Sequence, residues 1–375
     1  MSSFTVVHVI SAEDVFGPEK TTINECLWLN NKNCRCIVIN IWNDENVPIR
    51  AKAEKAGVEY ISLVSVRRLD LKLISRLKSL LQSNKCQLVH SHGYKADLFT
   101  YLATRKTSIK RVTTIHGWTS EDVKVLVYEW LQSKVWRLFD RVYAVSQGYF
   151  DIAIKKKISS SKMRLIYNGI IVDNAKEFMR PDKKQAKVSF SLDPDKFLVS
   201  IIGRLSIEKG HDMFVSVAAE VLSQSDNVQF AIVGDGVQQA ALKKQIESLG
   251  IEDHVFFLGH CDQMQLLYDA TDAVAICSHR EGLPNVLLEA MLNEVPVVSL
   301  KVGGVPEVIE DGKNGLIVSG GKIEEFASKL RQLITDKEFY MSLSQDARKR
   351  IINNFSFEKR MTSIYEEYVT LIGGV

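Results

Sequence analysis

The chain has 375 residues, 46% of them hydrophobic and 25% charged, which predicts two folded domains and excludes a disordered chain. The formal net charge is only +3, and we expect no nucleic-acid partner. No run approaches the roughly 18 apolar residues of a membrane-spanning helix, and the opening MSSFTVVHVI has neither a basic head nor a cleavage site, so it predicts a β-strand rather than a signal peptide.

Short β-branched runs alternate with helix-length amphipathic stretches along the whole chain. In the first half we expect strands at 4–10, 34–41, 87–91, 111–116 and 141–146, and helices at 69–81 and 120–137. In the second half we expect strands at 197–202, 229–233, 255–258, 273–278 and 296–300, and helices at 213–222, 237–249 and 323–336. This alternation predicts parallel sheets with helices on both faces.

A polar stretch at 173–196 separates the two halves. It holds two prolines and several charges, a composition typical of a domain boundary. We therefore expect an N-terminal domain at 1–172 and a C-terminal domain at 173–355, with a last helix at about 356–375 packing back onto the first domain. Both domains are predicted to be α/β, Rossmann-like and doubly wound, and to face each other across a cleft.

Charge is distributed unevenly between the halves. Residues 1–175 hold 26 Lys and Arg against 16 Asp and Glu, whereas residues 176–375 hold 22 against 29. A basic first half indicates that it faces an anionic surface or substrate. Scattered solvated lysines would give the same counts, so both interpretations stay open.

The six cysteines predict neither a disulfide framework nor a metal site. None stands in a Cys-x-x-Cys pair, and no cluster of His, Cys and carboxylate residues has ligand spacing. We expect buried free thiols in a reducing compartment, by default the cytoplasm. Asp193-Pro194-Asp195 resembles a metal-binding Asp-x-Asp, but it lies in the predicted linker, so we expect no metal ion.

The segment REGLPNVLLEAM, at 280–291, directly follows a predicted strand. Its glycine and proline keep the backbone out of a helix until about Asn285, which puts Glu281 in a loop and Glu289 in the second turn of a helix. The N–H groups and positive dipole end at such a helix start favour a phosphate. Carboxylates on either side can accept hydrogen bonds from sugar or ribose hydroxyls. The alternative is that both glutamates are ordinary helix and surface charges.

Two cations follow another predicted strand. In GRLSIEKG, at 203–210, Arg204 and Lys209 lie on one connection, where a guanidinium fork and an ammonium group can clamp a diphosphate. Two surface cations near a turn are the alternative. The next strand ends in VGDG, at 233–236, which lacks the third glycine of a dinucleotide fingerprint and favours NAD only weakly.

In the first half, His92 and His116 each stand at the end of a predicted strand, where a crevice is expected. A lone histidine is more often structural than catalytic, so position alone does not decide their roles. Gly17, after the first strand, could let the backbone approach a ligand or belong to an ordinary loop. Neither a Gly-x-Ser-x-Gly motif nor a P-loop is present, which disfavours serine hydrolases and NTPases.

Together these segments resemble glycosyltransferase family 4, whose members are retaining enzymes of the GT-B architecture. The resemblance runs from Phe4 to about Val318, with the motifs GRLSIEKG, VGDG, FLGH, EGLPNVLLEAM, PVVSLKVGGVPEVI and DGKNGLIV in the order of the family. The Glu-x7-Glu pair formed by Glu281 and Glu289 is the family signature. The two Rossmann-like domains expected above are those of a GT-B fold.

The resemblance implies roles for these charged residues. Arg204 and Lys209 would hold the donor diphosphate and stabilise the leaving nucleotide. Glu281 would contact hydroxyls of the donor sugar, and Glu289 would hold the ribose hydroxyls.

Backbone groups and the first domain would complete the implied site. The backbone at Leu283, Pro284 and Asn285 would meet the diphosphate, and His116 matches the histidine that lies beside the reacting sugar. The family often has two glycines after the first strand, whereas here Gly17 precedes a proline, which has no N–H. Anion or acceptor contacts at Gly17 are therefore expected to differ.

We therefore expect a retaining hexosyltransferase that moves a hexose from a nucleotide-diphospho-sugar, by family frequency a UDP-sugar, to a glycan or lipid-linked acceptor. No cofactor and no metal ion are expected, because protein cations and a helix N-terminus would stabilise the leaving diphosphate. Basic residues at 67–78 and 155–157 would attract an anionic surface. They predict peripheral association with the inner face of the cytoplasmic membrane and a role in bacterial surface polysaccharide or lipopolysaccharide assembly.

Other functions fit the same residues. A nucleotide-sugar 2-epimerase shares the GT-B architecture and would convert the donor without an acceptor. A non-catalytic partner would bind a nucleotide-sugar and support another transferase. The motif residues are all present, which argues against the loss of a catalytic site. A nicotinamide dehydrogenase is disfavoured by the missing glycine.

Overall fold

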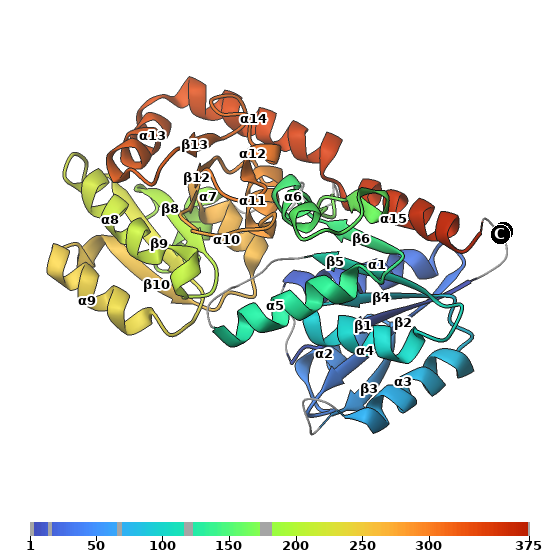
Figure 1. The fold of residues 1–375 in the computed structure, drawn as a ribbon. Helices are drawn as coiled ribbons and strands as arrows, with labels where there is room; N and C mark the ends of the chain where they lie inside the picture. The colour runs from blue at the N-terminus through green and yellow to red at the C-terminus, as the bar shows by residue number, and fades with distance from the viewer. Residues whose placement is uncertain (1–3, 14–16, 66–69, 116–122, 173–181, 374–375) are drawn as a thin grey trace. The chain divides into compact units, whose positions relative to one another are not determined.

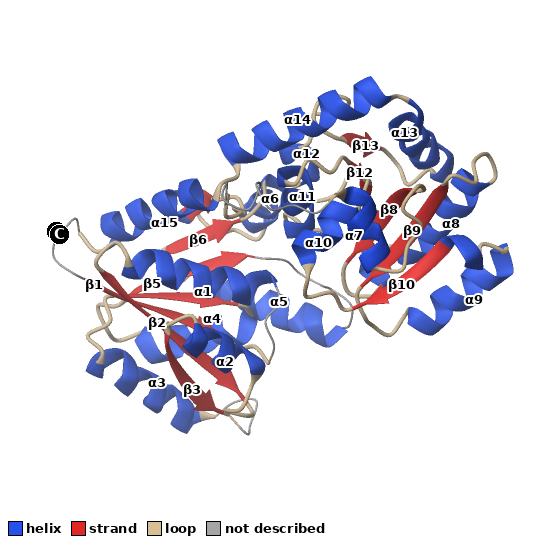
Figure 2. Ribbon diagram, turned by 180° about the vertical axis from the view of Figure 1, so that it is seen from behind, coloured by secondary structure: helices blue, strands red, loops and turns tan. Residues whose placement is uncertain are grey.

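The structure is a computed structural model that describes residues 4–13, 17–65, 70–115, 123–172 and 182–373. The chain divides into two compact units, one formed by Met1–Tyr167 with Glu358–Val375 and the other by Asn168–Phe357. Each unit is built on one parallel sheet with helices on both faces (Figure 1 and Figure 2). This confirms the predicted α/β, doubly wound fold class.

The first unit holds a seven-stranded sheet in the order β3-β2-β1-β4-β5-β6-β7. Its strands are β1 (Phe4–Ile10), β2 (Cys34–Trp42), β3 (Glu59–Val64), β4 (Leu88–His92), β5 (Lys110–Ile115), β6 (Arg141–Ala144) and β7 (Met163–Leu165). Its helices are α1 (Gly17–Asn30), α2 (Pro48–Lys55), α3 (Leu71–Ser83), α4 (Tyr94–Thr104), α5 (Val123–Trp136), α6 (Gln147–Lys155) and α15 (Phe357–Leu371). The strand order reverses between β1 and β4, which places a topological switch point there.

The second unit holds a six-stranded parallel sheet in the order β10-β9-β8-β11-β12-β13. Its strands are β8 (Phe197–Ile202), β9 (Val228–Val233), β10 (Val255–Gly259), β11 (Ala273–Ile276), β12 (Val297–Leu300) and β13 (Leu316–Val318). Its helices are α7 (Lys183–Ser189), α8 (His211–Leu222), α9 (Gln239–Leu249), α10 (Met264–Ala270), α11 (Asn285–Leu292), α12 (Val305–Val308), α13 (Ile323–Thr335) and α14 (Lys337–Asn354). Here the order reverses between β8 and β11.

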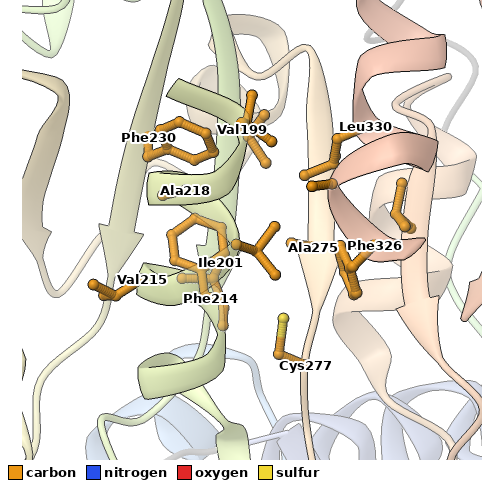
Figure 3. Close-up of a cluster of buried hydrophobic side chains, with 14 of the residues drawn as sticks. Val199, Ile201, Phe214, Val215, Ala218, Phe230, Ala275, Cys277, Phe326 and Leu330 are labelled. Carbon is orange, nitrogen blue, oxygen red and sulfur yellow. The ribbon is translucent and has the colours of Figure 1, made fainter. Parts of the chain in front are cut away.

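The core of the second unit follows from the helical period of α8. Phe214, Ala218 and Val221 recur every three or four residues, so they form one apolar face, and all three are fully buried. That face packs on the alternate residues of β8 and β9, with the rings of Phe214 and Phe230 5.7 Å apart edge to face (Figure 3). Burial of each of the larger side chains, such as Phe214 and Val221, contributes roughly 1.5–3 kcal/mol.

The two faces of the first sheet are covered by different helices. Apolar residues of α3 and α4 cover one face, while α1 and the C-terminal helix α15 cover the other. Helix α15 is held by an ion pair from Arg360 to Glu25 of α1, 2.6 Å between Nη2 and Oε1, and by a contact of Tyr368 with His90 of β4. All six cysteines are free thiols and five of them are buried, as the sequence predicts.

The division between the units lies between Tyr167 and Asn168, earlier than the polar stretch 173–196. Residues 173–181 of that stretch lie outside the described residues, but the rest contains helix α7 rather than an extended linker. The lysines of α7 are paired with carboxylates: Lys187 is buried and its Nζ lies 2.6 Å from Asp272, whereas Lys184 pairs with Asp195 at the surface. No helix among the described residues is long and apolar enough to cross a membrane.

Candidate functional site

The loops after β8 and β11 meet at the switch point of the second sheet, where parallel α/β folds bind ligands. The backbone N–H of His279 donates to the carbonyl of Glu208 at 2.8 Å, which joins the two loops. The loop after β8 is also joined to the loop after β9, because Leu205 N–H donates to the carbonyl of Asp235 at 2.9 Å. These bonds bring the segments 203–210 and 277–285 to one edge of the sheet.

Lys209 and Glu281 form an ion pair at this edge. The Nζ atom of Lys209 lies 2.7 Å from Oε1 of Glu281, and the carboxylate side chain is only 10% exposed. The pair closes a small cavity that is also lined by Cys277, Pro284 and Val286. The ammonium group of such a pair can bind a phosphate, and the carboxylate can accept a hydrogen bond from a hydroxyl group.

Arg204 is held by Glu208, which the sequence motifs did not single out. The Nη2 atom of Arg204 donates to Oε1 of Glu208 at 2.8 Å. Burial opposes ionisation of Glu208, but hydrogen bonds from Ser206, from its own backbone N–H and from Arg204 outweigh it, so its pKa falls to about 2. Glu208 is therefore anionic at neutral pH and holds an exposed guanidinium at the rim of the site.

Two glycines let the loops approach each other. A Cβ atom on Gly303 would lie 2.1 Å from the carbonyl oxygen of Glu281, and the next N–H, of Gly304, donates to the carbonyl of Gly282 at 2.6 Å. A Cβ on Gly210, at φ +66°, would lie 2.1 Å from the carbonyl oxygen of Cys277. Only glycine fits at either contact, so these residues determine where Lys209 and Glu281 lie.

Close packing of two loops also accounts for the glycine at the start of the VGDG turn. A Cβ atom on Gly234 would lie 2.1 Å from the carbonyl oxygen of Gly203. The glycine is thus required because the turns after β9 and β8 pack closely, and it needs no dinucleotide to account for it.

Glu289 and the start of α11 lie beside this pair of loops. Helix α11 begins at Asn285, and within the described residues no side chain caps its N-terminus, so N–H groups of its first turn are available to an anion. Glu289 stands in the second turn, and the Tyr268 hydroxyl donates to its Oε2 at 2.8 Å. Burial, reinforced by Glu289, raises the pKa of Tyr268 well above its usual range. The side chain of Asn168 donates to the carbonyl of Leu283 at 2.9 Å.

The structure thus brings Arg204, Lys209, Glu281 and Glu289 to one edge of the second unit, together with the segment 283–285. Gly17 lies in the first unit, where it begins α1. His116 lies outside the described residues, directly after the end of β5 at Ile115. Glu208 and Tyr268, the partners of Arg204 and Glu289, are the site residues that the motifs missed.

Two family models match successive parts of the chain. Residues 17–174 match the family described as Glycosyltransferase Family 4, and residues 182–350 match the family described as Glycosyl transferases group 1. The first of these covers most of the first unit and the second covers the switch-point loops.

Several curated proteins are similar to the chain. It is 25% identical, over 99% of its length and 98% of the relative, to the UDP-Gal:alpha-D-GlcNAc-diphosphoundecaprenol alpha-1,3-galactosyltransferase of Escherichia coli. It is 28% identical to the N-acetyl-alpha-D-glucosaminyl L-malate synthase of Bacillus anthracis, over 79% of this chain and 78% of that protein. A Campylobacter jejuni N-acetyl-D-galactosaminyltransferase that acts on a PP-undecaprenol-linked glycan is 32% identical over 66% of each chain.

Solved structures show the same fold. The Anabaena protein HepE, crystallised with UDP, superposes with a TM-score of 0.87 at 22% identity, over 98% of this chain and all of that one. A glycosyltransferase from Rickettsia africae gives a TM-score of 0.85 at 19% identity over the full length of both chains. The fold is therefore that of the GT-B glycosyltransferases. The chain belongs to glycosyltransferase family 4 and is a hexosyltransferase.

Proposed function

We propose that the protein is a retaining transferase that moves a hexose from a UDP-sugar to a glycan or lipid-linked acceptor in bacterial surface polysaccharide or lipopolysaccharide synthesis. The observation that carries the proposal is the Lys209–Glu281 ion pair, held at the switch point beside Arg204 and Glu289. The relatives from E. coli and C. jejuni, named for undecaprenol-linked substrates, and the UDP-bound structure of HepE support the donor and acceptor classes.

In this proposal the ion pair exchanges partners when the donor binds. Lys209 turns from Glu281 to the diphosphate, and Glu281 accepts a hydrogen bond from a hydroxyl group of the sugar. Neither charge is left without a partner. Arg204, oriented by Glu208, adds to the positive field, as do the N–H groups of Leu283, just before α11, and of Asn285, its first residue. Glu289 accepts hydrogen bonds from the ribose hydroxyls.

The transition state explains this distribution of charge. As the bond from the sugar to the diphosphate breaks, the sugar becomes oxocarbenium-like and negative charge grows on the leaving UDP. Fixed cations and helix N–H groups stabilise that charge without reorganisation. They take the place of a divalent ion, so the proposed transfer needs neither metal nor cofactor. The acceptor hydroxyl attacks the face that UDP leaves, which retains the configuration. In this proposal His116 lies beside the reacting sugar and Gly17 contributes to binding of the donor.

The acceptor class connects with the charge of the first unit. Lys72, Arg76 and Lys78 lie on α3. Three more lysines stand at 155–157, where Lys155 is the last residue of α6. Near an anionic leaflet each basic residue contributes about 1 kcal/mol. A lipid-linked acceptor would draw the first unit to the inner face of the cytoplasmic membrane. Incidental charge and a soluble acceptor are the competing interpretation.

Calorimetric titration of UDP, GDP, ADP and NAD into the wild type and Glu289→Ala tests the donor site. We expect UDP to bind the wild type and to bind Glu289→Ala at least about tenfold more weakly, because the ribose loses its carboxylate partner. Binding of NAD alone would contradict a transferase site. Product analysis with a UDP-sugar then separates transfer, which gives a new glycoside and free UDP, from 2-epimerisation, which changes only the donor.

Sedimentation with vesicles of phosphatidylcholine and phosphatidylglycerol tests membrane association. We expect salt-sensitive binding that is lost when Lys72, Arg76 and Lys78 are changed to Glu. Reversal of two exposed lysines of α9, Lys243 and Lys244, is the control in the second unit. Equal sedimentation of all three proteins would favour incidental charge.

A further inference from the structure

A buried cluster of polar side chains lies at the switch point of the first sheet. The register pairs His8 of β1 with His90 of β4, and His92 is two residues further along the same strand, so the three imidazoles share one face of the sheet. Glu25 of α1 covers that face. Exposed fractions are 0% for His8, 1% for Glu25 and 9% for His92.

Two of these side chains carry polar atoms without a partner. The Nδ1 atom of His8 lies 3.0 Å from Nε2 of His92 and 3.8 Å from Oε2 of Glu25. Among the described residues, Oε2 of Glu25 and Nε2 of His8 have no hydrogen-bond partner, although the other carboxylate oxygen of Glu25 accepts from Arg360. An unsatisfied carboxylate oxygen in a protein core is costly, and this one points toward His8 and His92.

His90 is part of the cluster but is not available as a ligand. Its Nδ1 atom is 2.5 Å from the Tyr368 hydroxyl and its Nε2 atom is 2.7 Å from the Thr114 hydroxyl. Its ring packs against that of His92, with the centroids 4.3 Å apart. His90 therefore supports the neighbouring imidazole, as residues around a metal site do.

We propose that His8, Glu25 and His92 bind a divalent transition-metal ion, with Zn²⁺ as the best fit. Two imidazoles and a carboxylate are a common zinc ligand set. With bonds of about 2.0–2.2 Å, ligand atoms in a tetrahedral site lie roughly 3.3 Å apart, and the distances of 3.0 and 3.8 Å lie on either side of that value. The ion would give Oε2 its missing partner and connect β1, α1 and β4.

The neighbouring thiols bear on the charge of this site. Because Arg360 already neutralises Glu25, the ion would bring excess positive charge into the core. Cys26 and Cys36 group with His8 but not with Glu25 and His92, so these thiols lie near the charge without joining the ligand set. A water molecule would take the fourth position. This ion is structural, and the transfer proposed above is not routed through it.

Zinc titration of the full chain tests the site. The protein is stripped with a chelator, dialysed, titrated with Zn²⁺, and its metal content and melting temperature are measured. We expect one equivalent of zinc in the wild type and a higher melting temperature with zinc. Glu25→Gln and His92→Gln are each expected to bind zinc more than about tenfold more weakly. Tyr368→Phe, which loses the contact to His90 but keeps every ligand, is expected to bind one equivalent.

Other outcomes would overturn the proposal. A wild type that binds no zinc, or binds it no more tightly than Glu25→Gln, excludes the site. So does equal loss of zinc in Tyr368→Phe and His92→Gln, because the effect would then report general loosening of the core. If Glu25→Gln does not fold, His92→Gln and the absorption spectrum of the Co²⁺-substituted wild type decide, since a spectrum of hydrated Co²⁺ excludes bound metal. UDP affinity, a property of the second unit, tests the transferase proposal separately.

Discussion

At the scale of single residues, the ion pair between Lys209 and Glu281 is the feature with the clearest consequence for catalysis. Lys209→Ala removes the cation that is proposed to stabilise the leaving diphosphate and leaves Glu281 without its partner. We expect a fall in kcat of about 10²–10³, measured by UDP release. Lys184→Ala, which breaks an exposed ion pair with Asp195 in the same unit, is the control and should retain the wild-type rate.

The hydroxyl of Tyr268 positions Glu289, so its removal should weaken nucleotide binding. Tyr268→Phe deletes the 2.8 Å hydrogen bond and leaves the partly buried carboxylate of Glu289 with one donor fewer. We expect the Kd for UDP to rise about five- to tenfold, corresponding to about 1–1.4 kcal/mol. In the control Tyr340→Phe, a partly buried tyrosine of the same unit loses a hydrogen bond to the carbonyl of Asp272. Equal weakening of UDP binding in both variants would refute the positioning role.

His211 should make the second unit sensitive to acid. Burial, with a smaller effect of Lys209, lowers its pKa to about 4. Between pH 6.5 and pH 4, His211 is therefore protonated in the unfolded chain but neutral in the folded chain. The free energy of unfolding therefore carries no penalty from His211 above pH 6.5 and falls as the pH drops toward 4. By pH 5 the loss amounts to about 2 kcal/mol.

Urea unfolding at pH 7 and pH 5 measures this effect. His211→Leu should lose less stability than the wild type over the interval, because leucine does not titrate. His260→Leu, at a position that is 73% exposed, is the control. The same loss in the wild type and His211→Leu would assign the acid sensitivity to other groups.

At the scale of elements, the close approach of the β11 and β12 loops makes Gly303 a test of how the site is held. Gly303→Ala places a methyl group 2.1 Å from the carbonyl oxygen of Glu281, so the loop that carries Glu281 must move. We expect the loss of most transferase activity. Gly320→Ala imposes a similar positive φ in open space, costs about 1–2 kcal/mol of strain and should keep activity.

Elements with a strong local sequence pattern were predicted, and elements without one were missed. Central strands such as β8 and β9 are continuous apolar runs because both faces are buried, and they were predicted. Strands β3, β7 and β13 lie at sheet edges, where short or half-polar sequences give little pattern. Helix α7 was taken for a linker because its paired lysines look solvated in sequence.

The same contrast divides the functional residues. Arg204, Lys209, Glu281 and Glu289 stand in loop and helix motifs whose spacing is visible in the sequence. Tyr268, the partner of Glu289, comes from another element, 21 residues earlier in the chain, so no local motif announces it. The buried cluster of His8, Glu25 and His92 is assembled from three elements, so no ligand spacing exists to be read.

At the scale of the whole molecule, the C-terminal helix belongs to the first unit, although residues Asn168–Phe357, which separate it from the rest of that unit in the chain, form the second unit. Glu367 of α15 accepts from Nε of Arg141 at 2.9 Å and from Nε of Arg164 at 2.6 Å, and is only 21% exposed. One carboxylate thus joins α15 to the strands β6 and β7. Glu367→Ala would leave two partly buried guanidinium groups facing each other.

We expect Glu367→Ala to destabilise the first unit by about 1–3 kcal/mol, between the values of exposed and buried ion pairs. Hydrogen exchange can locate the effect, because amides that open by local unfolding report the stability of their own unit. Protection should fall in α15 and β6 and stay unchanged in α8. Glu366→Ala, at the neighbouring exposed position, is the control. Loss of protection that extends equally to α8 would show that the two units unfold as one, and unchanged protection everywhere would show that α15 is held by its apolar face alone.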